Sequence, residues 1–137
     1  RERLALLGMG LEDRMASPVG LLSGGQRQAL TLLMATYNPP KLLLLDEHTA
    51  ALDPKTAAKV LETTDMLVAK DKLTTIMITH NMRDAIKHGN RLIMMSEGRI
   101  ILDIKGEEKA KLTVTDLLQK FEAVSGQEFA SDQALLS

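Results

Sequence analysis

Four consecutive leucines, residues 42–45, constrain the fold more than any other stretch of this sequence. They follow a proline turn at residues 38–40 and lead directly into Asp46 and Glu47. A continuous apolar run that is too short for a typical helix is characteristic of a parallel strand covered on both faces. Leucine is not a strong strand former, so the flanking residues carry much of this interpretation. The sequence therefore predicts a buried strand in an α/β sheet.

The segments on either side of this strand alternate between helical and β patterns. Three helix starts have a clear physical cause. Ser23 with Gln26 three residues later forms a capping box, Asp53 precedes a proline at the first helical position, and Asn81 can cap a short helix. We expect an α/β sheet with right-handed crossovers, then a hairpin and a C-terminal helix. The expected helices cover residues 2–8, 11–15, 25–37, 54–70, 82–87 and a last one from 113, and the expected strands cover 42–45, 74–79, 91–96 and 99–104 around a turn at 97–98; from Ser125 onward we expect a frayed or disordered tail.

Composition excludes several classes of function. The 137 residues suit one small domain or part of a larger one, and the formal net charge of −1 gives no electrostatic footprint for nucleic acid. No cysteine is present, which rules out disulfides and thiolate metal sites. No apolar run approaches the length that spans a membrane. The chain opens without an initiator Met, which suggests a piece of a longer protein.

Residues 22–26, Leu-Ser-Gly-Gly-Gln, form a candidate anion site. The start of a helix presents backbone N–H groups and the positive end of the helix dipole. Gly24 and Gly25 carry no side chains, so an anion can approach the backbone closely. The alternative is an ordinary capped helix.

Three polar residues follow the two predicted parallel strands. Asp46 and Glu47 end the first and His80 ends the second, and ligands bind at such carboxyl ends in α/β sheets. Asp46 is placed to hold Mg²⁺ beside phosphates, and Glu47 to orient or deprotonate an attacking water. His80 can donate a hydrogen bond to a phosphate. The alternatives are a polar loop entrance and a structural histidine, with Asp53 only a helix cap and His48 a loop residue without a role.

Taken in order, four motifs resemble those of the ATP-binding cassette (ABC) ATPases: Leu-Ser-Gly-Gly-Gln, Leu-Leu-Leu-Leu-Asp-Glu, Ala-Leu-Asp-Pro and Ile-Thr-His. The resemblance covers roughly residues 19–106 and implies a partial P-loop NTPase-type layered sheet. It also implies a role for each matching residue. Ser23, Gly24, Gly25 and Gln26 correspond to the signature, which contacts the ATP held by an opposite subunit. Asp46 corresponds to the Walker-B acid that binds magnesium, and Glu47 to the catalytic base. Asp53 corresponds to the interface acid of the D-loop, and His80 to the switch histidine.

The resemblance implies partners and a location as well. The expected ligands are ATP and Mg²⁺, and the expected partners are a second ABC ATPase subunit, transmembrane permease subunits and a solute-binding protein, with no nucleic acid. Such a subunit lies in the cytoplasm on the inner face of the membrane. The implied division is into residues 1–37 (end of the helical subdomain and signature helix), 38–106 (Walker B, D-loop and switch-histidine core) and 107–137 (C-terminal helix and tail).

Two departures from the family pattern qualify these expectations. Residues 48–51 read His-Thr-Ala-Ala where the family commonly has Pro-Thr-Ser-Ala, and no glycine is followed by Lys, so the chain holds no Walker A motif. The chain thus resembles the C-terminal portion of a nucleotide-binding domain. We expect it to bind ATP poorly and to be inactive alone, with the strand at 42–45 exposing an apolar face and a bare edge.

Three functions remain open from the sequence. The leading hypothesis is the ATPase subunit of a bacterial membrane transporter. The second is a soluble ABC ATPase of DNA repair or translation, and the third is a non-catalytic docking module. Retention of Glu47 and His80 argues against the third.

Overall fold

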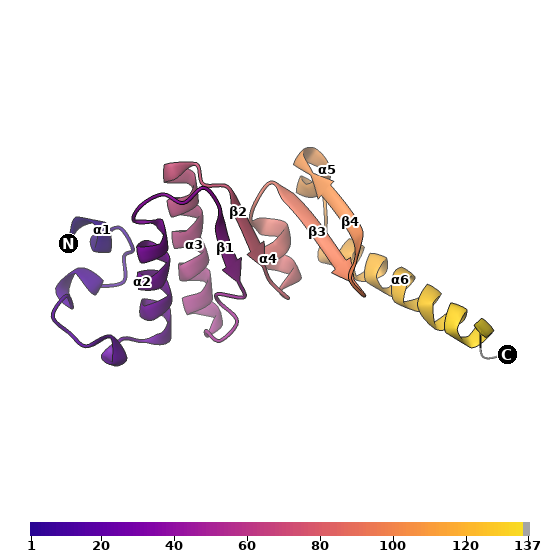
Figure 1. Cartoon of the computed structure of the whole chain (residues 1–137), viewed down its shortest axis with the longest axis horizontal. Coiled ribbons are helices and arrows are strands. Elements are labelled where there is room, and N and C mark those ends of the chain that lie inside the picture. The colour runs from indigo at the N-terminus through magenta and orange to yellow at the C-terminus, as the bar shows by residue number, and fades with distance from the viewer. Residues whose placement is uncertain (136–137) are drawn as a thin grey trace. The chain divides into compact units, whose positions relative to one another are not determined.

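A computed structural model of the chain (Figure 1) describes the backbone of residues 1–135 and the side chains of residues 1–124. The chain divides into two compact units, one from Arg1 to Thr79 and one from His80 onward. Each unit has its own sheet, and each sheet has two strands. The α/β class with a parallel pair, a hairpin and a C-terminal helix is confirmed.

The first unit is built on a parallel strand pair. β1 pairs with β2 in a register that sets Leu43 opposite Thr75 and Asp46 opposite Ile78. The 18-residue helix α3 connects the two strands, and α2 packs beside α3 (Figure 1). The elements of this unit are α1 (Glu2–Ala5), η1 (Leu11–Asp13), η2 (Val19–Leu21), α2 (Gly24–Thr36), β1 (Leu43–Asp46), α3 (Pro54–Asp71) and β2 (Thr75–Ile78).

An aliphatic core joins the two long helices to one face of this sheet. Alternate residues of β1, Leu43 and Leu45, point into it because successive strand side chains face opposite ways. The remaining buried members come from the N-terminal segment, α2, α3 and the turn between α3 and β2: Leu7, Leu11, Leu22, Ala29, Leu32, Leu33, Leu67 and Leu73. The core holds no aromatic side chain, in agreement with a chain that has two Phe, one Tyr and no Trp.

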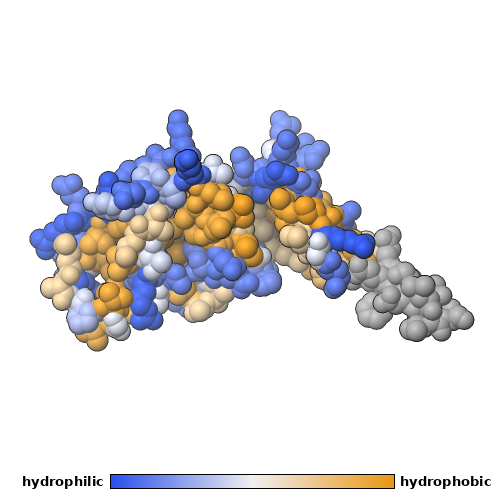
Figure 2. Space-filling model, in the orientation of Figure 1, coloured by the Kyte–Doolittle hydropathy of each residue, from blue (hydrophilic) through white to orange (hydrophobic). Residues whose placement is uncertain are grey.

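The other face of the β1–β2 sheet is exposed, so the prediction that both faces are covered is wrong. Leu44 is 65% exposed, and Ile76 and Ile78 are each 52% exposed. These side chains form the apolar patch over β1 and β2 in Figure 2. Within the described residues β1 has one strand neighbour. These exposed side chains agree with the expectation of an exposed apolar face.

The second unit contains an antiparallel hairpin and three helices. Glu97 and Gly98 join the strands in the two-residue turn that the sequence predicts, and their φ values of 46° and 72° are those of a type I′ turn. The ammonium group of Lys109 is buried and donates to the carbonyl oxygens of Ile86 and His88 at the end of α4. Burial lowers the pKa of Lys109. The elements are α4 (Met82–Lys87), β3 (Arg91–Ser96), β4 (Arg99–Lys105), α5 (Gly106–Ala110) and α6 (Val114–Leu135).

Helix lengths differ from prediction at the two ends of the chain. The first helix stops at Ala5 rather than at Gly8, whose left-handed conformation ends the turn. The last helix continues past Ser125 to Leu135, where a frayed tail was expected. Residues 126–135 include two Gln, two Ala and one Glu, which are good helix formers. No helix in the described part of the chain is long and apolar enough to cross a membrane.

Candidate functional site

The capping box at the start of α2 is confirmed. Ser23 Oγ accepts a hydrogen bond from the backbone N–H of Gln26 at 3.2 Å, and Gln26 Oε1 accepts one from the backbone N–H of Ser23 at 3.0 Å. The Gln26 amide also donates to the carbonyl oxygen of Met9 at 3.0 Å. The cap satisfies the third amide of the helix, and those of Gly24 and Gly25 have no acceptor within the helix itself.

Gly25 has a second role that the sequence did not reveal. It is buried, and a Cβ atom at this position would lie 2.1 Å from Thr56 Cγ2 in the first turn of α3. At Gly24 a Cβ would lie 3.2 Å from Leu52 Cδ2. The glycines therefore also permit the N-terminal turns of α2 and α3 to pack closely against each other.

The N-terminus of α3 is capped by Asp53, as predicted. Its Oδ1 accepts a hydrogen bond from the backbone N–H of Thr56 at 3.1 Å, and Pro54 occupies the first helical position. Hydrogen bonds from Thr56 hold the pKa of Asp53 below its usual range.

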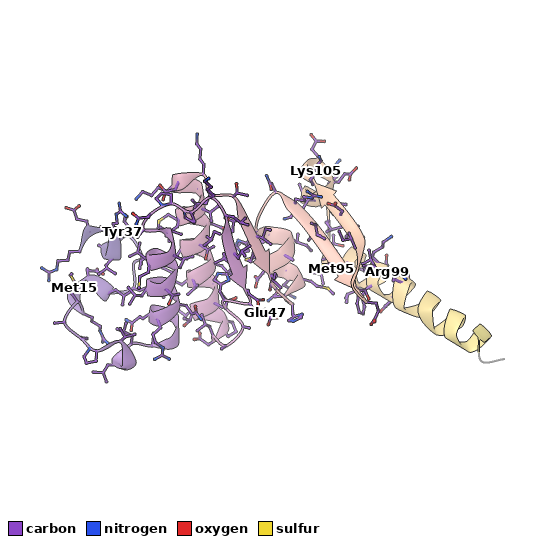
Figure 3. The ribbon with its side chains drawn as sticks, viewed as in Figure 1. Met15, Tyr37, Glu47, Met95, Arg99 and Lys105 are labelled. Atoms are coloured by element: carbon purple, nitrogen blue, oxygen red, sulfur yellow. The ribbon has the colours of Figure 1, made fainter. Side chains whose placement is uncertain are left out.

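Asp46 and Glu47 lie at the end of β1 and are both exposed. Glu47 extends the ladder, because its backbone N–H donates to the carbonyl oxygen of Ile78 at 2.9 Å. Its φ of 47° is left-handed, which is costly for a residue with a Cβ atom. Figure 3 shows Glu47 just beyond the end of β1.

His48 is a residue whose role the sequence analysis missed. Its Nε2 lies 3.1 Å from Thr64 Oγ1 on the buried face of α3. The Thr64 hydroxyl donates its proton to the carbonyl oxygen of Val60 at 2.9 Å. With the Thr64 hydroxyl donating to Val60, the bond to His48 uses the tautomer that carries a proton on Nε2. The available signal was the departure from proline at this position.

The first unit thus brings most of the predicted site residues to one end of its sheet. The parallel strands end there, and α2 and α3 begin there (Figure 1). The site residues gathered at this end are Ser23, Gly24, Gly25, Gln26, Asp46, Glu47 and Asp53. His80 follows β2 by two residues in the chain and opens the second unit. That His80 lies close to Asp46 and Glu47 is a prediction from the sequence.

The donor set at this end fits a magnesium ion shared with phosphates. Among the residues that the structure describes, no three His, Cys, Asp or Glu side chains gather as a metal cage. Mg²⁺ is commonly bound through one or two carboxylates together with the oxygens of substrate phosphates. The carboxylate of Asp46, exposed at the end of β1, would suit this mode of binding.

The fold is that of an ATP-binding cassette, a P-loop NTPase-type domain. The chain resembles a crystal structure of the ADP conformation of MJ1267, an ATP-binding cassette of an ABC transporter, with a TM-score of 0.73 and 27% identity over 88% of this chain and 47% of that one. It also resembles the dimeric post-hydrolysis state of the ATP-binding cassette MJ0796 bound to ADP and Pi. There the TM-score is 0.59 and the identity 32%, over 76% of this chain and 44% of that one.

Sequence comparisons agree. The profile of the ABC transporter family matches residues 2–50. A tyrosine transport ATP-binding protein of Clostridioides difficile is 50% identical over 85% of this chain and 46% of its own length. The methionine import ATP-binding protein MetN of Streptococcus mutans is 41% identical over 77% of this chain and 31% of its own length. The chain belongs to the ABC transporter ATPase family, and it spans less than half the length of these relatives.

Proposed function

We propose that the full protein containing this chain is the ATP-binding and ATP-hydrolysing subunit of an ABC membrane transporter. The observation that carries this proposal is the gathering of a capped glycine turn and two acids at one end of the first unit. Related proteins named as tyrosine transport and methionine import ATP-binding proteins support a small organic solute and the import direction.

In this proposal each site residue acts on the nucleotide or across a subunit interface. The backbone of Gly24 and Gly25, at the start of α2, contacts the terminal phosphate of ATP held by a second ABC ATPase subunit, with Ser23 and Gln26 fixing the turn. Asp53 lies next to that turn and faces the same interface. The phosphate cradle itself comes from a Walker A motif, which these 137 residues do not contain.

The proposed chemistry uses the two acids and the histidine. Asp46 would hold Mg²⁺, which neutralises charge on the phosphates when bound. Glu47 orients the attacking water and accepts its proton, and His80 donates a hydrogen bond to the terminal phosphate. The proposal keeps the division into residues 1–37, 38–106 and 107–137 that the family resemblance implies.

The proposed setting is the inner face of the cell membrane. The cassette binds transmembrane permease subunits there, and a solute-binding protein delivers the solute on the other side. A soluble ABC ATPase of DNA repair or translation is the second candidate. Purification of the full protein from its own cells distinguishes the two. Copurification of a membrane protein would favour the transporter, and purification without one would favour the soluble alternative.

A comparison of two Glu→Gln variants in the full protein tests the ATPase. We expect E47Q to abolish steady-state turnover while ATP binding persists, because the neutral amide cannot accept the proton of the water. E62Q alters an exposed glutamate on α3 outside the site, and we expect its turnover to equal that of the unaltered protein. Equal turnover in E47Q and E62Q would contradict the role of Glu47.

A further inference from the structure

The loop after β1 contains a strained residue and a buried anchor next to each other. Glu47 has a left-handed backbone, and His48 directs its ring from the loop to Thr64 on α3. Sparsely populated conformations of this kind persist only where surrounding contacts hold them in place. The question is which contacts hold Glu47.

Backbone hydrogen bonds hold Glu47 on two sides. Its N–H donates to the carbonyl oxygen of Ile78 at 2.9 Å, and its carbonyl oxygen accepts from the N–H of Ala50 at 3.0 Å. The next residue along the chain, His48, adds a contact to a rigid helix, because Thr64 is 5% exposed and lies in the middle of α3.

We propose that His48, through its hydrogen bond to Thr64, is a positioning residue that holds Glu47 in its left-handed conformation and so aims the Glu47 carboxylate. This proposal rests on the role given to Glu47 under the proposed function. With the Thr64 hydroxyl donating to Val60, the tautomer of His48 that carries a proton on Nε2 donates to the Thr64 oxygen. Either T64V or H48A breaks this hydrogen bond.

α3 offers a matched control for the Thr64 hydroxyl. Thr63 is also buried, and its hydroxyl donates to the carbonyl oxygen of Lys59 at 2.9 Å, four residues back, as that of Thr64 does to Val60. The hydroxyl of Thr64 also bonds to His48 Nε2, at 3.1 Å. T63V and T64V therefore remove equivalent hydroxyl groups, and T64V alone leaves the Nε2–H of His48 without this acceptor.

The first measurement does not depend on activity. Amide hydrogen exchange in the full protein reports the bond from Glu47 N–H to Ile78. We expect T64V and H48A to accelerate exchange at Glu47. T63V and T64S both keep a hydroxyl group at position 64, so we expect them to leave this exchange unchanged. Ring ¹⁵N shifts of His48 should show the Nε2–H form in the unaltered protein and a change in T64V. Equal exchange at Glu47 in T64V and T63V would overturn the proposal.

The second measurement separates positioning from folding. A misplaced catalytic base lowers kcat and leaves KM for ATP nearly unchanged. We expect T64V and H48A to lose about ten- to a hundredfold in kcat, with rescue by T64S and no loss in T63V. H48A alters a loop residue, so it remains informative if T64V fails to fold. If kcat falls equally in T63V and T64V, the positioning role is wrong.

The two proposals fail in different ways. An unaltered protein without ATPase activity would refute the proposed function, and the exchange data would still decide whether the His48–Thr64 bond holds Glu47. An active protein in which E47Q is inactive but H48A has full kcat would refute the positioning role alone.

Discussion

The first turns of α2 and α3 lie against each other, yet they are built for different partners. α2 begins with the neutral cap Ser23 followed by two glycines, and α3 begins with the anionic cap Asp53 followed by a proline. Both caps accept a hydrogen bond from the third amide of their helix, at 3.2 Å and 3.1 Å. The two helix starts therefore differ in the charge of the cap and in the number of first-turn amides left without an acceptor in the helix.

The two helix starts differ in how far their own residues satisfy the free amides and the dipole. At α3 the proline has no N–H and the Asp53 carboxylate already complements the helix dipole. At α2 the cap carries no charge, and the amides of Gly24 and Gly25 remain for an outside acceptor. A phosphate would be repelled by the first arrangement and attracted by the second, which supports the proposed phosphate contact at α2 and the proposed interface role of Asp53.

The largest effect is expected where the two helix starts touch, at Gly25. In G25A the new Cβ would lie 2.1 Å from Thr56 Cγ2, so α2 and α3 must separate or distort. We expect a loss of about 1–3 kcal/mol in the free energy of unfolding, as for other overpacked positions. Denaturant unfolding of the full protein measures this loss.

Two further variants show whether this contact is the cause. T56S removes the methyl group that a Cβ at 25 would meet, so G25A/T56S should recover part of the stability that G25A loses. G24A would meet the flexible end of Leu52 at 3.2 Å, and we expect little change. A loss in G24A as large as that in G25A would show that the helix start, and not its packing on α3, requires glycine.

The next effect concerns the charge of the cap. S23A removes the acceptor for the Gln26 amide, and we expect it to cost about 0.5–2 kcal/mol of stability. S23D keeps an acceptor at the cap and adds a negative charge, which makes α2 resemble α3. S23D should therefore retain stability but weaken ATP-driven association of two subunits, measured by light scattering. Unchanged association in S23D would contradict phosphate contact at α2.

Much of the fold could be predicted because its signals are local. The caps at Ser23, Asp53 and Asn81 and the turn at residues 97–98 each follow from residue types a few positions apart. The exposed outer face of β1 could not be predicted from the four leucines alone. A continuous apolar run does not say which face is covered within the same chain, since that depends on which elements pack there.

The residue types of the candidate site could be predicted, but the tertiary contacts that hold those residues in place could not. The acids at the end of β1 follow from the strand and from the motif order. The bond from His48 to Thr64 joins residues sixteen positions apart, and the contact between Gly25 and Thr56 joins two helices. Such pairs depend on how α3 packs on its neighbours, and no local pattern encodes them. The left-handed backbone of Glu47 is likewise set by tertiary contacts.

The smallest effect is expected from the charge of Asp53. Its pKa in the folded protein is lowered from 3.8 by hydrogen bonds from Thr56, so the charged form is favoured by folding. The stability that this charge contributes is fully present above the pKa of the unfolded chain and is lost as the pH falls through the lower, folded value.

D53N keeps a capping oxygen but does not titrate. We expect the Tm of D53N to equal that of the unaltered protein at the acidic end of a pH series and to fall slightly below it once the pH exceeds about 4. D53A lacks the cap as well and should lie below D53N throughout. A constant difference between D53N and the unaltered protein at every pH would mean that the cap at α3 acts through its shape and not its charge, and the contrast with α2 would then rest on the glycines alone.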